Sequence, residues 1–354
     1  MRKFFASHTL IKKGLLWVSV LGLLFVLSGG LIRFFEPSHT VNAQSSNASV
    51  RPIFSLFGDA TATDTPATPS MTPSASVTVG ATPSVTPSTT PTSSSLPHYD
   101  HVVVVIEENK GYSEIIGNSA APYINGLAAQ GMSFTDSHAI THPSQPNYLD
   151  LYSGSDQGVF GDICPSSAFQ GPDLGGQLLS ANLSFAGYSE GLPSAGALDC
   201  TNSANAYARK HNPWADFGDT SGAATNLPFT SFPTNTAGYS ALPTVSFVVP
   251  NLNNDMHDGT VQQGDTWLQQ NMDAYAQWAK ANNSLLIVTW DEEDVTNSNN
   301  TNQVATIFVG QHVQVGTNNT TINHYNVLRT LEDMYGLAPA NNAANASDIL
   351  GVWN

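Results

Sequence analysis

The run HVVVVIEEN, residues 101–109, decides the fold that we expect for this chain. Its five consecutive β-branched residues, 102–106, are typical of a strand buried on both faces, as in a parallel sheet. The run then changes abruptly to Glu107, Glu108 and Asn109, whose side chains offer hard oxygen donors. Open α/β sheets bind ligands beyond the carboxyl ends of their strands, so we expect a functional site at this end.

Further strands and helices alternate along the chain after this run. Apolar runs predict strands at 184–188, 244–249, 285–290 and 304–309, and helical spacing predicts helices at 122–130, 177–183, 265–281 and 324–335. Asn323 is the expected N-cap of the last helix and Gly336 its stop. Residues 192–242, rich in Asn, Pro, Ser, Thr and Gly, are expected to form long functional loops. The alternation predicts an α/β fold with a largely parallel central sheet flanked by helices.

The chain divides into three segments by composition. Residues 1–43 combine basic residues with an apolar run and predict either a cleaved signal peptide or a retained membrane anchor. Residues 44–97 are rich in Ser, Thr and Pro and are expected to be a disordered stalk. Residues 98–354 then form the catalytic domain. We therefore expect a protein that is secreted or anchored on the outer face of the cell membrane.

Net charge limits the binding partners that we expect, and the cysteine content limits the disulfides. The formal net charge is −16, and removing the five basic residues that precede residue 34 leaves −21. Such an acidic chain is not expected to bind nucleic acid, because phosphate neutralisation needs a basic patch. Cys164 and Cys200 are the only cysteines, and in an exported protein they are expected either to form one disulfide or to remain two buried thiols.

Polar residues follow three of the predicted strands. The exits are 107–109, 250–258 (PNLNNDMHD) and 291–294 (DEED). Because the carboxyl ends of parallel strands share one edge of a sheet, these side chains are expected to converge. Carboxylates crowded together are unfavourable unless they are protonated or bind a metal. A hard divalent cation, Ca²⁺, Mg²⁺ or Mn²⁺, fits such oxygen donors better than zinc does.

Ser144 is the candidate nucleophile. It lies in His142-Pro143-Ser144-Gln145-Pro146-Asn147, and a metal held by Glu108 and Asn109 beside it would lower the pKa of its hydroxyl. Asn147 is a candidate donor to a phosphoryl oxygen, and His257 can donate to the same group or protonate a leaving oxygen. Arg209, Lys210 and His211 form the cationic cluster of the predicted domain and are candidate anion contacts.

Each candidate has a structural alternative. Acidic residues after a strand are commonly turn residues or helix caps, and a serine between prolines is commonly part of a rigid loop. His257 can be a solvated surface residue, and residues 209–211 an ordinary salt-bridging patch. We interpret His324 as the first residue of a helix rather than as a metal ligand.

Five segments together resemble the bacterial phosphoesterase family of the alkaline phosphatase superfamily, which includes acid phosphatases and phospholipase C-type enzymes. They are 101–131, 137–154 (SHAITHPSQPNYLDLYSG), 207–214 (YARKHNPW), 243–259 (PTVSFVVPNLNNDMHDG) and 285–294 (LLIVTWDEED). The chain is most similar to the acid-phosphatase branch, some members of which act on phosphoinositides. The resemblance implies an alkaline phosphatase-like fold.

The resemblance also implies roles for individual residues. Its implied metal ligands are Glu108, Asn109, Ser144, Asp291 and Glu292. Ser144, His211 and His257 are implied to be catalytic, and Asn147 to contact the substrate phosphate, with Arg209 and Lys210 as further candidate phosphate contacts. Glu107 can be confused with Glu108, but its neighbour Asn109 favours Glu108.

We therefore predict an exported, metal-dependent phosphomonoesterase of acid phosphatase type that forms a phosphoserine intermediate. Its expected substrate is a small phosphomonoester or a phospholipid headgroup. The rivals are a phospholipase C-like phosphodiesterase and an inactive cell-surface binding module. A metal-free Ser-His-Asp hydrolase is disfavoured, because Ser144 lacks the Gly-x-Ser-x-Gly motif of such enzymes.

Overall fold

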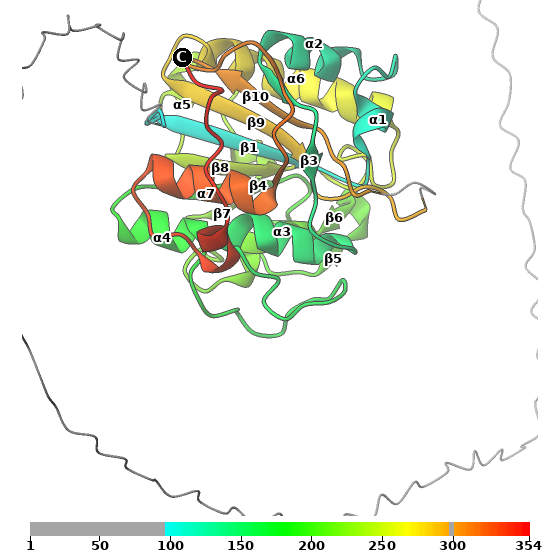
Figure 1. Ribbon diagram of the computed structural model, residues 1–354. Coiled ribbons are helices and arrows are strands. Elements are labelled where there is room, and N and C mark those ends of the chain that lie inside the picture. Colours follow the sequence, from blue (N-terminus) through cyan, green and yellow to red (C-terminus); the bar gives the residue numbers. More distant parts are fainter. Residues whose placement is uncertain (1–95, 297–300) are drawn as a thin grey trace, which may run out of the picture. The chain divides into compact units, whose positions relative to one another are not determined.

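An eight-stranded sheet organises residues 96–296 and 301–354, which are the part of the chain described by the computed structural model (Figure 1). In order across the sheet its strands are β11 (Gly316–Asn318), β2 (Met132–Phe134), β10 (Thr306–Gly310), β9 (Ser284–Trp290), β1 (His101–Glu107), β8 (Val245–Val249), β4 (Phe185–Ser189) and β7 (Asn226–Pro228). The strand predicted from residues 102–106 thus lies at the centre of the sheet.

The sheet is mostly parallel, which confirms the predicted α/β class. β1 pairs in parallel with β8 and β9, and β4 pairs in parallel with β8 and β7. β10, expected at 304–309, runs antiparallel to both β9 and β2. A parallel return would need a crossover, usually a helix, and the described residues between β9 and β10 contain no helix.

Helices cover both faces of the sheet. One face packs against α1 (Tyr112–Ile115), α2 (Pro122–Gln130), α5 (Thr236–Tyr239) and α6 (Val261–Ala279). The other face packs against α3 (Ser144–Ser153), α4 (Leu174–Ser180) and α7 (His324–Met334), as Figure 1 shows. Successive residues of β1 alternate between these two layers, which is why its whole apolar run is buried.

Helix boundaries follow their capping residues. α2 has the predicted bounds, and α7 begins after Asn323, whose side chain accepts hydrogen bonds from the backbone N–H groups of Tyr325 and Asn326. α4 begins earlier than predicted, because Asp173 caps it by accepting from the N–H of Gly176. α6 likewise begins four residues before the predicted 265, since Thr260 is its N-cap.

The region 192–242 contains short structured elements instead of long loops. It holds the strand pair β5 (Thr201–Asn202) and β6 (Tyr207–Ala208), strand β7, helix α5 and the 3₁₀ segments η1 (Ser203–Asn205), η2 (Arg209–His211), η3 (Pro213–Asp216) and η4 (Phe229–Ser231). Elsewhere β3 (Ser137–His138) pairs with β12 (Ile322–Asn323), and η5 (Asn341–Asn345) follows α7. Cys164 and Cys200 form a disulfide, the first of the two expected alternatives.

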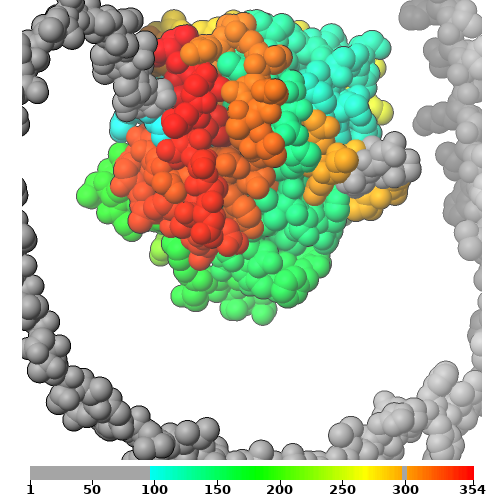
Figure 2. Space-filling model, viewed as in Figure 1, coloured from blue at the N-terminus to red at the C-terminus, as the bar shows by residue number. Residues whose placement is uncertain are grey.

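The C-terminal residues pack along the α3 and α7 side of the sheet. Figure 2 shows this segment in red against the orange surface that includes α7. Its backbone is bonded to the rest of the domain, since the backbone N–H of Gln314 donates to the carbonyl of Val352 and that of Asn354 donates to the carbonyl of His312.

The helix that begins with Ser144, α3, is followed by its C-cap residue Gly154, which has a φ of 70°. A Cβ there would lie 2.2 Å from the carbonyl oxygen of Ala340, so glycine is required.

Within the described residues no helix has both the length and the apolar character to cross a membrane. The predicted signal peptide or anchor, residues 1–43, lies outside the described residues. So does the predicted stalk, 44–97, apart from its last two residues. The domain boundaries proposed for these segments stay predictions.

A buried carboxyl on α7 makes folding sensitive to pH. Burial raises the pKa of Glu332 to about 8, although Ala340 donates a backbone hydrogen bond of 2.7 Å to its Oε1. The folded state therefore keeps a proton that the unfolded state has lost between about pH 4.5 and 8, and stability falls as pH rises through this window. We expect Glu332→Gln to raise the melting temperature at pH 8.5 and to change it little at pH 4. Equal shifts at both pH values in thermal melts would contradict this.

Candidate active site

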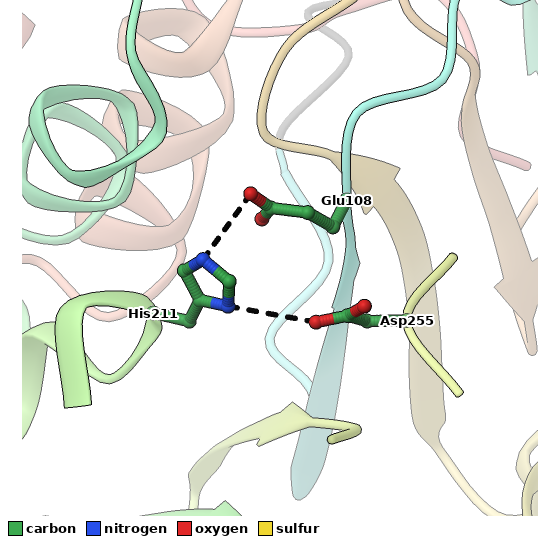
Figure 3. Close-up of side chains that lie close together, drawn as sticks. All are labelled: Glu108, His211 and Asp255. Carbon is green, nitrogen blue, oxygen red and sulfur yellow. Dashed lines mark ion pairs between the residues drawn. The ribbon is translucent and has the colours of Figure 1, made fainter. Parts of the chain in front are cut away.

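Three chain segments meet at the carboxyl edge of β1, β8 and β9. The three strands are parallel neighbours, so their exits lie side by side as predicted. Figure 3 shows Glu108, His211 and Asp255, which follow β1, β6 and β8, pointing toward one another. A second group, Glu108, Asp291 and Glu292, joins the exits of β1 and β9. In each group one ligand atom per residue lies within 4.8 Å of the others, and all five side chains are buried.

Glu108, and not Glu107, is the acidic residue that faces Ser144. Ser144 Oγ lies 2.5 Å from Glu108 Oε1, and Glu107 projects to the opposite side of the sheet because strand residues alternate. Burial, together with Asp255 and Glu190, holds the pKa of Glu107 well above its usual range. Asn109 then turns the chain with a φ of 55°, a conformation that asparagine tolerates.

Ser144 is the first residue of α3 and is buried. Its Oγ lies 2.5 Å from Glu108 Oε1 and 2.9 Å from Glu292 Oε1. A hydroxyl has one proton, so it can donate to only one of these oxygens at a time. The position at a helix N-terminus also favours an anion, since the first backbone N–H groups of a helix lack partners within it. Ser144 thus presents a hydroxyl with two possible proton acceptors in contact.

The second acidic group fits a cation. Asp291 accepts a 3.0 Å hydrogen bond from the backbone N–H of Asn109 through Oδ1, whereas its buried Oδ2 has no hydrogen-bond partner among the described residues. Burial, Glu108 and Glu292 together raise the pKa of Asp291 well above its usual range. A divalent cation would remove that repulsion and supply the missing partner. The donors of this group are oxygens alone, the ligand type that hard metal ions prefer.

His211 joins the two groups electrostatically. Its Nε2 lies 3.2 Å from Glu108 Oε1 and its Nδ1 lies 3.5 Å from Asp255 Oδ2 (Figure 3). Burial alone would lower the pKa of His211, but the two carboxylates raise it to about 9. In turn, the charge of His211 and hydrogen bonds from His211, Ser144 and Tyr148 overcome burial and lower the pKa of Glu108 to about 2. Burial raises the pKa of Asp255 to about 6.

Two of the predicted phosphate contacts have other partners in the structure. The Asn147 side chain accepts from the N–H groups of Ile140 and Thr141 and donates to the carbonyls of Thr141 and Pro143, so all of its bonds hold the loop before Ser144. Arg209 is buried and pairs with Asp216 at 2.7 Å. The amide of Asn147 and the guanidinium of Arg209 therefore already have partners within the protein. Their positions do not support the predicted contacts with a substrate phosphate.

The remaining predicted residues lie beside the cluster. Lys210 pairs with Asp162 at 2.6 Å. Burial acts to lower its pKa, but Asp162, Glu108 and Asp291 raise it. The ring of His257 lies 6.0 Å from that of His211, and its Nδ1 lies 2.7 Å from Asp258 Oδ1. As predicted, His324 begins α7; its Nε2 bonds the carbonyl of Asp291 at 2.7 Å, and burial lowers its pKa to about 4.

Sequence reasoning missed three residues of the site. Tyr148 donates to Glu108 Oε2 at 2.7 Å and stacks on His211 with ring centroids 5.0 Å apart. His142 bonds Glu292 through Nδ1. Asp255 lies in the second predicted exit, 250–258, but no role was predicted for it. Tyr148 lies four residues after Ser144, which places both on one helix face and could have indicated it. The contact of His142 depends on loop geometry and has no such signal.

Comparisons with known proteins identify the family of this chain and several relatives. The sequence model of the phosphoesterase family matches residues 118–338. Phosphatidylinositol-3-phosphatase of Mycobacterium tuberculosis is 50% identical over 261 residues, which cover 74% of this chain and 85% of that protein. An acid phosphatase of Aspergillus fumigatus is 29% identical over 235 residues, covering 60% of this chain and 50% of that protein. The chain thus spans about half the length of that fungal relative.

Solved structures show the same fold. A protein in the alkaline phosphatase superfamily from Vibrio parahaemolyticus superposes with a TM-score of 0.50 at 12% identity, covering 70% of this chain and 71% of that one. The lipoteichoic acid synthase LtaP from Listeria monocytogenes gives a TM-score of 0.50 at 11% identity, covering 74% and 78%. These likenesses confirm the predicted alkaline phosphatase-like fold.

Proposed function

The chain belongs to the phosphoesterase family, and on that premise we propose that this phosphate ester hydrolase is an exported, metal-dependent phosphomonoesterase with Ser144 as its nucleophile. The observation that most supports the proposal is the position of Ser144 Oγ, in contact with Glu108 and Glu292 at the edge that also holds Asp291. Export rests on the pattern of residues 1–43 alone.

Glu108, Asp291 and Glu292 would hold the metal, with Asn109 and Ser144 beside them. A divalent cation bound there would supply Lewis-acid stabilisation of charge on the phosphoryl group and would lower the pKa of the Ser144 hydroxyl. The oxygen-only donor set favours Ca²⁺, Mg²⁺ or Mn²⁺ over zinc.

The protein's own groups account for the proton transfers. Ser144 Oγ forms a bond to phosphorus while the bond from phosphorus to the leaving oxygen breaks, and the hydroxyl proton passes to Glu292. His257 gives a proton to the leaving oxygen. In the second half, water attacks the phosphoserine and gives its proton to the now neutral His257, while Ser144 recovers its proton from Glu292. The sum is one ester hydrolysed and both groups restored.

Positive charge around the cluster would stabilise the phosphoryl group. His211 and Lys210 both have raised pKa values, because the carboxylates near them overcome the effect of burial, and this favours the protonated form of each. The N-terminus of α3 adds partial positive charge at Ser144. We assign phosphate stabilisation to these three features and leave Asn147 and Arg209 as supports of the loops around them.

The substrate that we propose is a phosphoinositide monoester. The support is the relative of 50% identity that is named a phosphatidylinositol-3-phosphatase. The test incubates the full chain and Mn²⁺ separately with phosphatidylinositol 3-phosphate and with phosphatidylcholine. Release of inorganic phosphate from the first and no phosphocholine from the second supports a monoesterase. Phosphocholine release without inorganic phosphate would make the enzyme phospholipase C-like, and no product from either, or from p-nitrophenyl phosphate, would favour a binding module.

Tyr148 is expected to position Glu108. Its hydroxyl makes a 2.7 Å bond to Glu108 Oε2 and leaves Oε1 for Ser144. Tyr148→Phe keeps the ring stacked on His211 and removes only this bond. Hydrogen bonds to charged groups contribute about 1.5–3 kcal/mol, so we expect kcat/KM to fall roughly 10- to 100-fold. The matched control is Tyr152→Phe in the same helix, whose hydroxyl bonds Thr220; equal losses in both variants would contradict the assignment.

A further inference from the structure

A groove lined mainly by uncharged polar side chains lies next to the candidate active site. It consists of two cavities of about 680 and 580 Å³ that share Glu190 and Phe229 in their linings. The first is bounded by the N-terminal part of α6, and the second by η1, β7 and the loop that follows β8. None of the groups that surround Ser144 lines either cavity, so the groove takes no part in the proton transfers described above.

Side-chain amides dominate this groove. Eight of its lining residues are Asn or Gln, among them Asn205, Asn253, Asn254, Gln262 and Gln270. Amides offer both donors and acceptors without net charge. Among the described residues that line the cavities there is no Lys, Arg or His. The groove is therefore unsuited to phosphate or another anion.

Its one carboxylate is already used within the protein. Glu190 accepts from the backbone N–H of Asn251 at 3.0 Å and from Asn254 Nδ2 at 2.9 and 3.1 Å. Asn254 Oδ1 in turn accepts from Gln263 at 3.2 Å. These bonds fix the orientation of the Asn254 and Gln263 side chains. An array of neutral donors and acceptors, two of them held in place, matches a ligand that has several hydroxyl groups.

An aromatic surface completes the groove. Phe229 is half-buried, and its ring lies 5.0 Å from the buried ring of Trp267, measured between centroids. The faces of aromatic rings carry negative charge and attract the positively polarised C–H groups of a ring that bears hydroxyls. Amides beside an aromatic face suit a sugar or a cyclitol, which has hydroxyls at its rim and C–H groups on its faces.

We propose that this groove binds an uncharged, polyhydroxylated ring ligand. A ligand of this chemistry can come from two sources, which are a neutral glycan and the sugar-alcohol part of the enzyme's own substrate. The second source rests on the proposed function. The groove and the candidate active site are adjacent, since Asn254 lines the groove while the next residue, Asp255, faces His211. The first source does not depend on any phosphatase chemistry.

The test measures binding of neutral probes to the full chain by saturation-transfer NMR. The probes are myo-inositol and the oligosaccharides maltohexaose and chitohexaose. The variant is Gln262→Ala with Gln270→Ala, two exposed groove residues on α6, and the matched control is Gln269→Ala, also exposed on α6 but outside both linings. We expect the double variant to bind about 10- to 100-fold more weakly and the control to match the wild type. Turnover of p-nitrophenyl phosphate should be unchanged in both.

The outcomes separate the two sources from each other and from the proposed function. Binding of an oligosaccharide supports the groove with a separate glycan as its ligand, and binding of myo-inositol alone supports it with the substrate headgroup. Either result can be obtained even if the chain releases no phosphate from any ester. No saturable binding of any probe at roughly millimolar concentration, or equal binding by the wild type and the double variant, would overturn the proposal.

Discussion

Ser144→Ala is expected to lower the rate of phosphate release by about 10³-fold or more, a loss of the size seen when a nucleophile is removed. The substitution deletes the one hydroxyl that contacts both Glu108 and Glu292. It leaves the ion pair of Glu108 with His211 and the hydrogen bond from Tyr148 in place. The fold should therefore persist, so the loss would be chemical.

The measurement is phosphate release from p-nitrophenyl phosphate with Mn²⁺ present, together with a thermal melt. Ser153→Ala is the matched control, since Ser153 is a buried serine of the same helix and its hydroxyl can donate to the carbonyl of either Leu149 or Ser155. It should keep nearly full activity. In addition, acid quenching of the wild type during turnover of labelled substrate should leave phosphate on Ser144. Activity of Ser144→Ala within tenfold of the wild type would contradict a serine nucleophile.

Asp291→Asn is expected to weaken cation binding and to lower activity by about 10²-fold or more, since even residues that only support metal ligands affect binding 10- to 100-fold. The amide retains an oxygen for the 3.0 Å bond from the backbone N–H of Asn109, so the loop should keep its position. What disappears is one negative charge next to Glu108 and Glu292. Calorimetric titration with Mn²⁺, and recovery of activity when Mn²⁺ is restored after chelation, measure the effect.

Glu293→Gln is the control for this change, because Glu293 follows directly in the same acidic run but is not part of the Glu108, Asp291 and Glu292 group. It should bind Mn²⁺ as the wild type does. The run Asp-Glu-Glu-Asp does not by itself determine which neighbours of Asp291 bind a metal. If Glu293→Gln loses cation binding and Asp291→Asn does not, the group has been assigned to the wrong carboxylates.

The parts of the fold that could be predicted are those that depend on local pattern. The apolar run of β1 is buried on both faces because it lies in the middle of a parallel sheet, and its alternation separates Glu108 from Glu107. The convergence of the β1 and β9 exits followed from parallel pairing alone. The N-cap of α7 could be predicted from Asn323, because asparagine is among the residues preferred at the N-cap position.

Other features depend on packing between distant segments. The apolar pattern of β10 predicts a strand. Its antiparallel direction, however, is set by how the chain returns from β9. Arg209 is one of few cations in an acidic chain, and its pairing with the buried Asp216 could not be predicted from the sequence. The bond of His142 to Glu292 spans 150 residues, and no spacing rule connects the two positions.

The most direct test of the account is to locate a bound cation. Crystals of the full chain grown with Mn²⁺, measured for anomalous scattering, should give a peak within roughly 2.0–2.6 Å of oxygens from Glu108 and Asp291, next to Ser144 Oγ. A peak elsewhere in the molecule, or none at saturating Mn²⁺, would contradict the claim that the ends of separate strands hold one metal beside the nucleophile.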